Sequence, residues 1–357
     1  MDTLTDIAVQ KAEQSRLAEV DLDNPGFGKV FTDHMLEMEY KDGEWKQPVI
    51  KPYGPIQITP ALSTLHYGQS VFEGTKAYYI DGETVNLFRP EKNYERMVNS
   101  CERLCIPKID RETFLEGIRQ LVKLDHKWVP EKDGNSLYIR PFACAWDAQV
   151  AAKVSDTYRF YIILSPVGSY YNAPVRLITS QNYVRAVEGG FGEAKTAGNY
   201  AASFYPARKA QSMGFSQVLW LDAFEHEYVE EVGTMNIFFF IDDVLITPPL
   251  GGTILPGVTR DSVLKLARSW EMNVEERKIG MTEVMDAANS GKLQEVFGAG
   301  TAAVIAPVKE IRHHGELISI HEDGRGPVGQ KLYDTIYGIQ RGKVEDPFNW
   351  THHITVG

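Results

Sequence analysis

A single lysine stands among small residues in the stretch GGFGEAKTAGNY, which runs from Gly189 to Tyr200. Glycines and alanines let a backbone or a ligand approach closely, so the surroundings of Lys195 suit a chemical role. An amine that reacts with an aldehyde must be neutral part of the time, which requires a partly desolvated site. Lys195 is therefore a candidate to form a Schiff base with the aldehyde of a cofactor.

Two further possibilities for Lys195 stay open at this point. Lys195 could be a solvated surface residue, as about nine in ten lysines are. The stretch also nearly fits the phosphate-binding pattern G-x-x-x-x-G-K-[ST], but Ala194 occupies the last glycine position. The preceding residues 183–188 carry charges where a buried parallel strand should be apolar. A P-loop nucleotide binder is thus disfavoured and remains the alternative from another class of protein.

A pyridoxal phosphate site would also need a cradle for the phosphate, and the sequence offers two candidates. In the segment 253–270, Gly257 precedes an amphipathic helix for which Thr259 is a natural N-cap. The N–H groups at such a helix start can bind an anion, although most capped helices bind nothing. The second candidate is the Gly-x-Gly-Thr turn within 297–308, where backbone N–H groups can face a ligand.

The same site would need an acid opposite the pyridine nitrogen of the cofactor. Glu230 and Glu231 stand ahead of Gly233 and a strongly apolar strand. A carboxylate at the mouth of such a strand can hold a protonated pyridine nitrogen as an ion pair in a low dielectric. An acidic turn that faces solvent is the alternative interpretation of this pair.

Helices and strands in both halves of the chain must position these residues. Apolar residues recur at helical spacing in some segments, and strand-sized apolar runs occupy others. We expect helices at 92–105, 113–129, 260–270, 282–290 and 329–341, and strands at 136–144, 158–164, 216–222 and 235–249. This mixture predicts a two-domain protein of the α/β and α+β classes.

One stretch, GSYYNAPVR, marks a domain boundary because its Gly, Asn and Pro follow directly after an apolar strand. It divides the chain into a smaller N-terminal α/β domain at 1–168, a linker at 169–177 and a larger C-terminal domain at 178–357. The larger domain would carry the lysine, the acids and both phosphate cradles.

The charge and the apolar runs exclude several partners. The chain of 357 residues has 37 basic and 48 acidic residues, a net charge of −11, and no basic run, so we expect no nucleic acid. The first twenty residues lack the apolar core of a signal peptide and the arginines of a transit peptide. The longest apolar runs are too short to span a bilayer. We expect a cytoplasmic protein without a membrane partner.

Three cysteines, Cys101, Cys105 and Cys144, are too few and odd in number for a disulfide framework. Cys101 and Cys105 continue the helical spacing of the segment 92–105, and no histidine lies close to them in sequence. We therefore expect core thiols in a reducing compartment and no metal site.

Eight segments together resemble the branched-chain amino acid aminotransferases, the L-specific members of the fold-type IV pyridoxal phosphate enzymes. They are FGKVFTDHML, LHYGQSVFEGTKAY, SLYIRP, GEAKTAGNY, QVLWL, EVGTMNIF, ILPGVTR and FGAGTAAV, in this order over most of the chain. The resemblance implies the fold-type IV, D-amino acid aminotransferase-like fold, with pyridoxal 5'-phosphate bound to the C-terminal domain.

The resemblance assigns roles to individual residues. Lys195 matches the catalytic lysine that binds the cofactor aldehyde and then shuttles a proton. Glu231 matches the acid that pairs with the pyridine nitrogen, and Tyr200 matches the hydroxyl near the phenolic oxygen of the ring. Further cofactor contacts are implied for Arg96, Thr234, Leu255, Gly257, Val258, Thr259 and Thr301.

The resemblance also implies the reaction and the substrate pocket. The amino group of L-leucine, L-isoleucine or L-valine passes to the cofactor and then to 2-oxoglutarate, which gives L-glutamate in a ping-pong cycle within a homodimer. Pocket positions are matched by Phe27, Tyr67, Phe72, Tyr138, Arg140, Thr234 and Ala302. A D-amino acid aminotransferase or an aminodeoxychorismate lyase remains the alternative within the fold, although the FTDHML and LYIRP segments argue against both.

Overall fold

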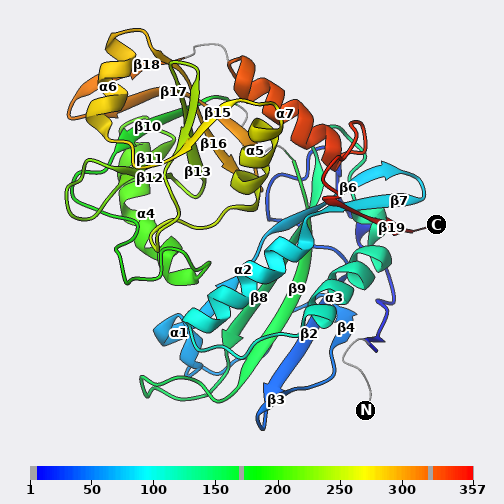
Figure 1. Ribbon diagram of the computed structural model, residues 1–357. Helices are drawn as coiled ribbons and strands as arrows, with labels where there is room; N and C mark the ends of the chain where they lie inside the picture. Colours follow the sequence, from blue (N-terminus) through cyan, green and yellow to red (C-terminus); the bar gives the residue numbers. More distant parts are fainter. Residues whose placement is uncertain (1–5, 169–172, 321–324, 357) are drawn as a thin grey trace. The chain divides into compact units, whose positions relative to one another are not determined.

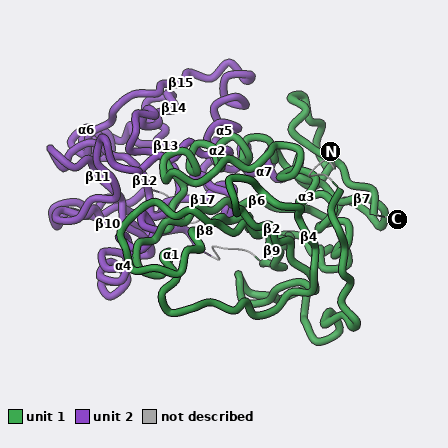
Figure 2. The backbone as a smooth tube through the Cα atoms, turned by 90° about the horizontal axis from the view of Figure 1, so that it is seen from below, with its two compact units in different colours: residues 1–170, 194–197, 339–357 green, residues 171–193, 198–338 purple. Residues whose placement is uncertain are grey.

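The computed structural model describes residues 6–168, 173–320 and 325–356, and the chain divides into two compact units (Figure 2). Unit 1 comprises residues 1–170, 194–197 and 339–357, and unit 2 comprises residues 171–193 and 198–338. The predicted linker, 169–177, lies partly outside the described residues. Unit 2 also stops short of the predicted domain end at 357, because strand β19 (Thr351–Thr355) pairs antiparallel with β7 (Thr84–Phe88) of unit 1.

Within the described residues, unit 1 contains a ten-stranded sheet in the order β1-β4-β2-β9-β8-β6-β7-β19, with β3 on β2 and β5 on β8 (Figure 1). All of its strand pairs are antiparallel except β1 with β4. The elements not yet given bounds are β1 Ala8–Val9, η1 Leu17–Glu19, β2 His34–Lys41, β3 Glu44–Trp45, β4 Val49–Pro52, α1 Ser63–Tyr67, β5 Ser70–Phe72, β6 Thr75–Asp81, α2 Pro90–Arg103, α3 Arg111–Leu124, η2 His126–Trp128, β8 Ser136–Ala145 and β9 Tyr158–Val167.

Helices α2 and α3 pack side by side on this sheet and bury their apolar faces in the core of unit 1 (Figure 1). Asp110 caps α3, since its side chain accepts a hydrogen bond of 3.0 Å from the Thr113 N–H. Gly117 brings α3 close to the sheet, because a Cβ there would lie 2.8 Å from Leu36 Cδ1. The predicted helices at 92–105 and 113–129 are thus confirmed, although the second ends at Leu124 and continues as the short turn η2.

Within its described residues, unit 2 contains a nine-stranded mixed sheet in the order β12-β11-β10-β17-β16-β13-β14-β15, with β18 on β17. The strands are β10 Val175–Thr179, β11 Gln217–Leu221, β12 Val229–Val232, β13 Asn236–Ile241, β14 Val244–Thr247, β15 Asn273–Glu276, β16 Leu293–Gly300, β17 Val304–His313 and β18 Glu316–Ser319. The helices of this part of the chain are α4 Ala197–Ser212, α5 Val258–Ser269, α6 Met281–Asn289 and α7 Pro327–Gln340. The mixture of strands and helices in both units confirms the predicted fold class.

The single strand predicted at 235–249 is wrong, because the segment forms the hairpin β13–β14. Asp242 and Asp243 make the turn with φ angles of 51° and 64°, and Ile241 pairs with Val244. Two successive positive φ values belong to the tight turn that matches the twist of paired strands, and aspartate tolerates this conformation. The acidic residues thus interrupt a run that reads as one strand in sequence.

The three cysteines divide into two environments. Cys101 and Cys144 are buried, and burial raises the pKa of each thiol to about 12. Cys105 is exposed, so its prediction as a core thiol is wrong. Helix α2 ends at Arg103, and Cys105 follows in a left-handed turn with φ of 55°, where the helical spacing no longer applies.

We expect native protein at pH 8 to react with one equivalent of a thiol reagent, and urea-unfolded protein to react with three. The thiolate is the reactive form, and pKa values of about 12 leave almost none of it on Cys101 and Cys144. Ellman's reagent measures the number of reactive thiols in each state. A Cys105→Ser variant should lose the native reaction, and two reactive thiols in its native state would contradict the burial described above.

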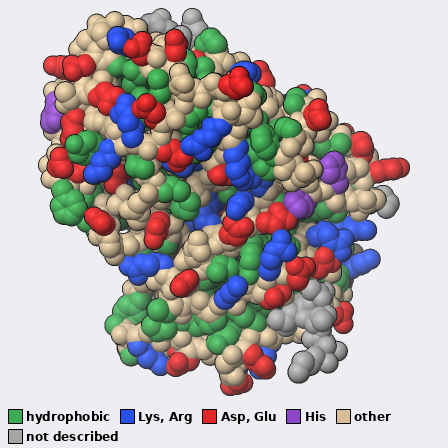
Figure 3. Space-filling model, in the orientation of Figure 1, with side chains coloured by type: hydrophobic (Ala, Val, Ile, Leu, Met, Phe, Trp, Pro, Cys, Tyr) green, Lys and Arg blue, Asp and Glu red, His purple; other side chains and the backbone are tan. Residues whose placement is uncertain are grey.

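Acidic and basic side chains are interspersed over the face shown in Figure 3. Many of them form surface ion pairs, as Lys292 does with Asp242. Among the described residues, no helix has both the length and the apolar character needed to cross a bilayer. The described residues also contain no cluster of three His, Cys, Asp or Glu side chains suited to a metal ion.

Candidate active site

Lys195 belongs to a four-residue segment, 194–197, that the contacts assign to unit 1. Its backbone is fixed at both ends, because its N–H donates to Ser100 Oγ at 2.9 Å and its carbonyl accepts from the Phe72 N–H at 3.0 Å. The side chain is half-buried, and Nζ lies 4.9 Å from the centre of the Phe72 ring. A lysine anchored in this way is not an ordinary solvated surface lysine.

The P-loop alternative fails on the elements around Lys195. A P-loop needs a buried strand, a glycine-rich turn and then a helix that begins at the lysine. Residues 183–188, all of them described, form no strand, and α4 begins after the lysine at Ala197. GGFGEAKT therefore resembles a nucleotide-binding motif in sequence but not in structure.

Arg96 projects from α2 into a buried ion pair with Glu73. Its Nε lies 2.7 Å from Glu73 Oε1, and its Nη2 donates to Oε2 at 2.9 Å. Burial alone would raise the pKa of Glu73, but the charge and hydrogen bonds of Arg96 outweigh burial and lower it below 4.5. The positive charge of Lys195 lowers the pKa of Glu73 further. Glu73 thus orients Arg96 and is a carboxylate close to the lysine.

The variant Glu73→Gln should lower the free energy of unfolding by about 3–5 kcal/mol, because it leaves the Arg96 guanidinium buried without its counter-charge. Urea unfolding followed by circular dichroism measures the loss. The control is Asp156→Asn, which breaks the exposed pair with Lys153 and should change little. Equal stability of the two variants would contradict a buried pair at Glu73.

The difference between the wild type and Glu73→Gln should also depend on pH. The folded-state pKa of Glu73 is depressed, so its contribution is fully present above the ordinary value of 4.5. It is lost as the pH falls through the lower folded-state pKa. The unfolding curves of the two proteins should therefore approach each other as the pH falls from 4.5 through that lower pKa, whereas curves at pH 7 should stay apart.

Four of the predicted substrate residues lie together in unit 1. Strand β8 points Tyr138 and Arg140 to the same face, and Arg140 Nη2 donates to the Tyr138 hydroxyl at 3.0 Å. The Arg140 Cζ lies 4.7 Å from the centre of the Phe72 ring, and the Phe27 ring meets Tyr138 edge-on at 5.5 Å. Arg140 Nε is buried and has no hydrogen-bond partner within the described ranges, which leaves a donor for an acidic ligand.

Tyr67 is the exception among the predicted substrate residues of unit 1. Its side chain is exposed, and its hydroxyl donates to the Val150 carbonyl. No hydrogen bond or ring contact joins it to the cluster of Phe27, Phe72 and Tyr138 in the described chain. The structure therefore does not bring Tyr67 to the other four.

In unit 2, Glu231 is buried in β12 and held from two sides. Its Oε1 accepts a hydrogen bond of 2.7 Å from the Leu255 N–H, and its Oε2 lies 2.9 Å from Arg185 Nε. The Arg185 guanidinium also donates to the carbonyls of Thr253 and Gly192, at 2.7 Å and 3.0 Å. A carboxylate with this set of donors keeps one fixed orientation.

Glu230, the other acid predicted here, has a different environment although it is adjacent in sequence. Successive residues of a strand point to opposite faces, so the two side chains diverge. Glu230 is buried, and in the described part of the chain its Oε2 has no hydrogen-bond partner. Burial raises the pKa of this carboxyl. The structure thus contradicts an acidic turn in solvent and distinguishes the two acids.

One small pocket of unit 2 brings together four residues that the sequence predicted for the cofactor. They are Tyr200, Glu231, Thr234 and Leu255, and the remaining lining residues are Arg185, Asn199, Ser203 and Gly233. The pocket therefore contains a fixed carboxylate and a phenol, two groups that a pyridine nitrogen and a ring oxygen require.

The start of α5 provides the candidate phosphate cradle. The helix begins at Val258, and Gly257 occupies the N-cap position with φ of −70° and ψ of 131°. The prediction of Thr259 as the N-cap is therefore wrong, and Thr259 lies in the first turn. Gly257 has no side chain for capping, and a Cβ there would lie 2.0 Å from Asn236 Oδ1. This helix start suits an anion, since no N-cap side chain of its own satisfies it.

The second predicted cradle is the turn between β16 and β17, which carries Thr301 and Ala302. Strand β16 ends at Gly300, and the chain turns through 301–303 before Val304 with φ of 60°. The interrupted apolar strand predicted for this segment is confirmed. No hydrogen bond joins Thr301 to the start of α5 among the described residues.

Each unit by itself contains groups that fit pyridoxal phosphate. Unit 1 has a half-buried lysine and a buried arginine, and unit 2 has a fixed carboxylate beside a phenol and a helix start without an N-cap side chain. Residues 70–311 match the model of the family described as amino-transferase class IV. The chain belongs to this family. Its members are pyridoxal phosphate enzymes, so the fold-type IV assignment is confirmed.

Relatives of this class IV aminotransferase carry a common name. Branched-chain-amino-acid transaminase 1 of Bacillus subtilis is 52% identical over 334 residues, which cover 92% of this chain and 94% of the relative. A branched-chain-amino-acid aminotransferase of Mycolicibacterium smegmatis is 47% identical over 339 residues, 92% of each chain.

Solved structures agree with the family. A branched-chain aminotransferase from Thermoproteus uzoniensis, solved with norvaline, superposes with a TM-score of 0.73 at 28% identity and covers 89% of this chain and 99% of its own. The Escherichia coli branched-chain amino acid aminotransferase gives 0.72 at 26% identity, with coverages of 89% and 98%. An enzyme of the same name from Thermobaculum terrenum, solved in its PLP form, gives 0.71 at 22% identity, with coverages of 90% and 98%, and shows the common fold.

Sequence reasoning missed three residues that organise the sites of this class IV aminotransferase. Ser100 holds the backbone of Lys195, Glu73 orients Arg96, and Arg185 fixes Glu231. None of them belongs to a local motif with its partner. Glu73 was the most accessible to prediction, since it lies inside the LHYGQSVFEGTKAY segment.

Proposed function

We propose that this chain is a branched-chain-amino-acid transaminase that uses pyridoxal 5'-phosphate. It would transfer the amino group of L-leucine, L-isoleucine or L-valine reversibly to 2-oxoglutarate, giving the branched 2-oxo acid and L-glutamate. The observation that carries the proposal is 52% identity to the Bacillus subtilis transaminase over 92% of the chain. The site geometry supports it, because each unit gathers several of the residue types that this chemistry requires.

In this proposal unit 2 holds the ring and the phosphate. Glu231, fixed by Arg185, would hold the pyridine nitrogen in its protonated form at a carboxylate oxygen. The Tyr200 hydroxyl would donate to the phenolic oxygen, and Leu255 and Thr234 would contact the ring. The N–H groups at the start of α5 would bind the phosphate at Gly257, Val258 and Thr259, together with Thr301 and with Arg96 of unit 1.

Lys195 is the proposed catalytic residue. When bound, pyridoxal phosphate supplies an aldehyde for the lysine amine and a ring that accepts electron density. The Lys195 amine would accept a proton from the substrate Cα and deliver it to C4′, the former aldehyde carbon of the cofactor. The neutral form of the amine is needed for this step.

The substrate residues are proposed to act through apolar contact and one charged group. Phe27, Phe72 and Tyr138 offer aromatic surface to a branched aliphatic side chain. Arg140 carries a buried donor without a partner, which can meet the side-chain carboxylate of glutamate or 2-oxoglutarate. Tyr67, Thr234 and Ala302 are proposed as further pocket residues on the family resemblance.

A donor comparison tests the proposed function. L-Leucine and D-alanine are each supplied with 2-oxoglutarate and added pyridoxal phosphate, and total glutamate of both configurations is measured by chromatography. Glutamate formed with L-leucine and not with D-alanine supports the proposal. The reverse result would identify a D-amino acid aminotransferase, and no glutamate from either donor would overturn transamination altogether.

We also propose a cytoplasmic homodimer, which rests on the family resemblance. Light scattering coupled to size-exclusion chromatography measures the mass directly. A mass near twice the 40.2 kDa of one chain is expected, and a monomer at working concentration would overturn the dimer.

A further inference from the structure

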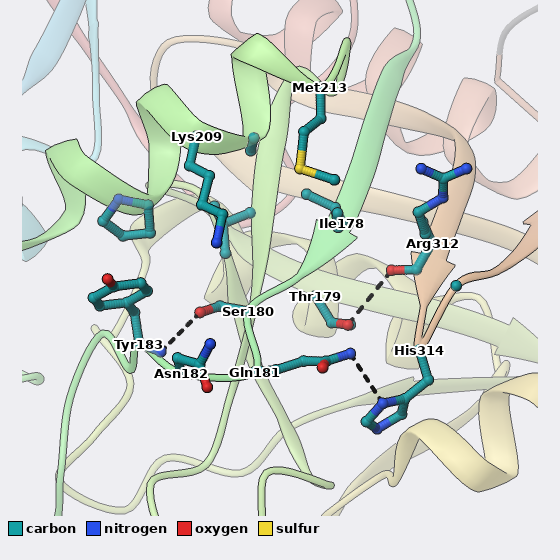
Figure 4. A pocket seen from close by; sticks show the side chains of 14 residues that line it. Ile178, Thr179, Ser180, Gln181, Asn182, Tyr183, Lys209, Met213, Arg312 and His314 are labelled. Carbon is teal, nitrogen blue, oxygen red and sulfur yellow. Dashed lines mark hydrogen bonds between the residues drawn. The ribbon is translucent and has the colours of Figure 1, made fainter.

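A second cavity of unit 2 shares no residue with the pocket of Tyr200 and Glu231 (Figure 4). Its volume is about 320 Å³, which lies within the size of ligand sites in proteins, roughly 300–1,000 Å³. Its walls come from the end of β10, the loop 180–183, the outer part of α4, and the end of β17 with the turn that follows it. The cavity is therefore built from three separate parts of the unit 2 chain.

The charged lining of this cavity is positive only. Lys209 and Arg312 line it, His314 stands at its edge, and none of its lining residues is an aspartate or a glutamate. Neither Lys209 nor Arg312 forms an ion pair within the described chain. Two cations without counter-ions attract an anion, even in a chain whose net charge is −11.

Arg312 has an unmet hydrogen-bonding need in addition to its charge. Its Nε is buried and has no hydrogen-bond partner among the residues that the structure describes. The Cζ lies 5.3 Å from the centre of the Phe215 ring, which holds the guanidinium without neutralising it. The guanidinium therefore adds uncompensated positive charge to the wall of the cavity.

The rest of the lining is an apolar surface with a polar edge. Ile178 and Met213 point toward one another in Figure 4, and Pro206, Ala210 and Val218 complete the apolar part. The loop that faces Lys209 is polar, and Gln181 Nε2 lies 2.9 Å from His314 Nδ1. This division suits a small molecule with a branched aliphatic end and a carboxylate end.

We propose that this cavity binds a small branched-chain 2-oxo acid. The carboxylate would be met by Lys209, whose ammonium points toward Ser180 in Figure 4, and the aliphatic end would lie against Ile178 and Met213. Arg312, on the far side of these two residues, would add positive charge to the wall of the cavity. An amino acid of the same shape would bind less well, because no acidic side chain lines the cavity to pair with its ammonium. The choice of a 2-oxo acid rests on the proposed function, which produces such acids.

Two parts of the cavity wall, the loop 180–183 and helix α4, are continuous in the chain with groups proposed to hold the cofactor. Tyr183 in the loop precedes Arg185 by two residues, and Arg185 holds Glu231. Helix α4 carries Tyr200 in its first turns and Lys209 near its C-terminal end, and Met213 directly follows the helix. A ligand that fixes the loop against α4 would therefore shift the positions of the Glu231 and Tyr200 side chains. The cavity would then act as an effector site.

A methyl NMR titration tests binding at this place. The full-length protein, loaded with pyridoxal phosphate, is labelled at the methionine methyl groups, and the Met213 signal is identified through Met213→Leu. The probe is 3-methyl-2-oxobutanoate, which the pyridoxal form of the enzyme cannot turn over. We expect a saturable shift of the Met213 signal, and isobutylamine, a branched cation, should cause none.

Two neighbouring variants on α4 make a matched pair. Lys209→Met should weaken the binding seen at Met213 by about tenfold, the effect of one charge-assisted hydrogen bond. Arg208→Met removes an adjacent exposed charge that does not line the cavity, and it should leave the affinity unchanged. Both changes affect helix surface positions, so both variants should fold.

Three results would overturn the proposal: no saturable shift at Met213, equal affinity in Lys209→Met and the wild type, or equal saturation by inorganic phosphate. The last would reveal a site for any anion and remove the role of the apolar surface. Transamination of L-leucine is measured on the same preparation. Transamination without a Met213 shift overturns only the cavity proposal, and a shift without transamination overturns only the proposed function.

Discussion

Lys195→Ala should reduce transamination of L-leucine by a factor of about a thousand or more and abolish the visible absorption band of the lysine-bound cofactor. Two functions are lost together in this variant, the amine that bonds to the aldehyde and the base that moves the proton. Proton transfer by a positioned side chain alone contributes roughly 10²–10⁴-fold. Stopped assays with 2-oxoglutarate and an absorption spectrum of the purified variant measure the two losses.

The control for this variant is Lys92→Ala, which removes an exposed lysine of the same unit that pairs with Glu95. It should keep both the spectrum and the rate of the wild type. Melting curves of both variants report whether the fold is intact. A Lys195→Ala protein that is folded, still yellow and within tenfold of the wild-type rate would remove the central residue of the proposed mechanism.

Glu231→Gln has the second-largest expected effect, a fall in kcat/KM of about 10²–10³-fold, the size seen when one preorganised electrostatic group is removed. The amide keeps the shape and can still accept from the Leu255 N–H, but it cannot pair as an anion with a protonated pyridine nitrogen. It also leaves the buried Arg185 guanidinium without its counter-charge. Steady-state rates, together with the cofactor spectrum across pH, measure the effect.

The adjacent acid gives a closely matched control. Glu230→Gln makes the same chemical change one residue away, on the opposite face of β12, at a carboxyl whose pKa burial already raises. We expect a rate within a few-fold of the wild type and an unchanged spectrum. If the two variants lose activity equally, the effect comes from disruption of β12, and the assignment of Glu231 to the pyridine nitrogen fails.

Local patterns in the sequence predicted five of the seven α-helices of the described chain, and only a minority of its strands. The apolar stripe of α3 and the segments that became α2, α5, α6 and α7 follow helical spacing, and the continuous apolar runs became buried strands. The predictions failed where the structure depends on a contact with a residue that is distant in sequence. Strand β12 contains two adjacent glutamates, and nothing near them in sequence shows that Arg185 neutralises Glu231.

Only some features of the candidate site could likewise be predicted from the local sequence. The position of Lys195 among small residues, the acid before the apolar strand and the helix start after Gly257 were all predictable from local chemistry. The fixed backbone of Lys195 was not, because Ser100 and Phe72 come from distant parts of the chain. The aromatic cluster around Tyr138 carries no sequence signal of its own, and only the family resemblance identified it.

The pairing of β19 with β7 has a consequence for the order in which the protein can fold during its synthesis. Residues 351–355 leave the ribosome long after residues 84–88, and the sheet of unit 1 has to wait for them. Meanwhile unit 2, which lies between these segments in the chain, can form first. Until β19 arrives, β7 presents an unpaired edge to other nascent chains, so a translation product that stops before residue 351 should aggregate in vivo.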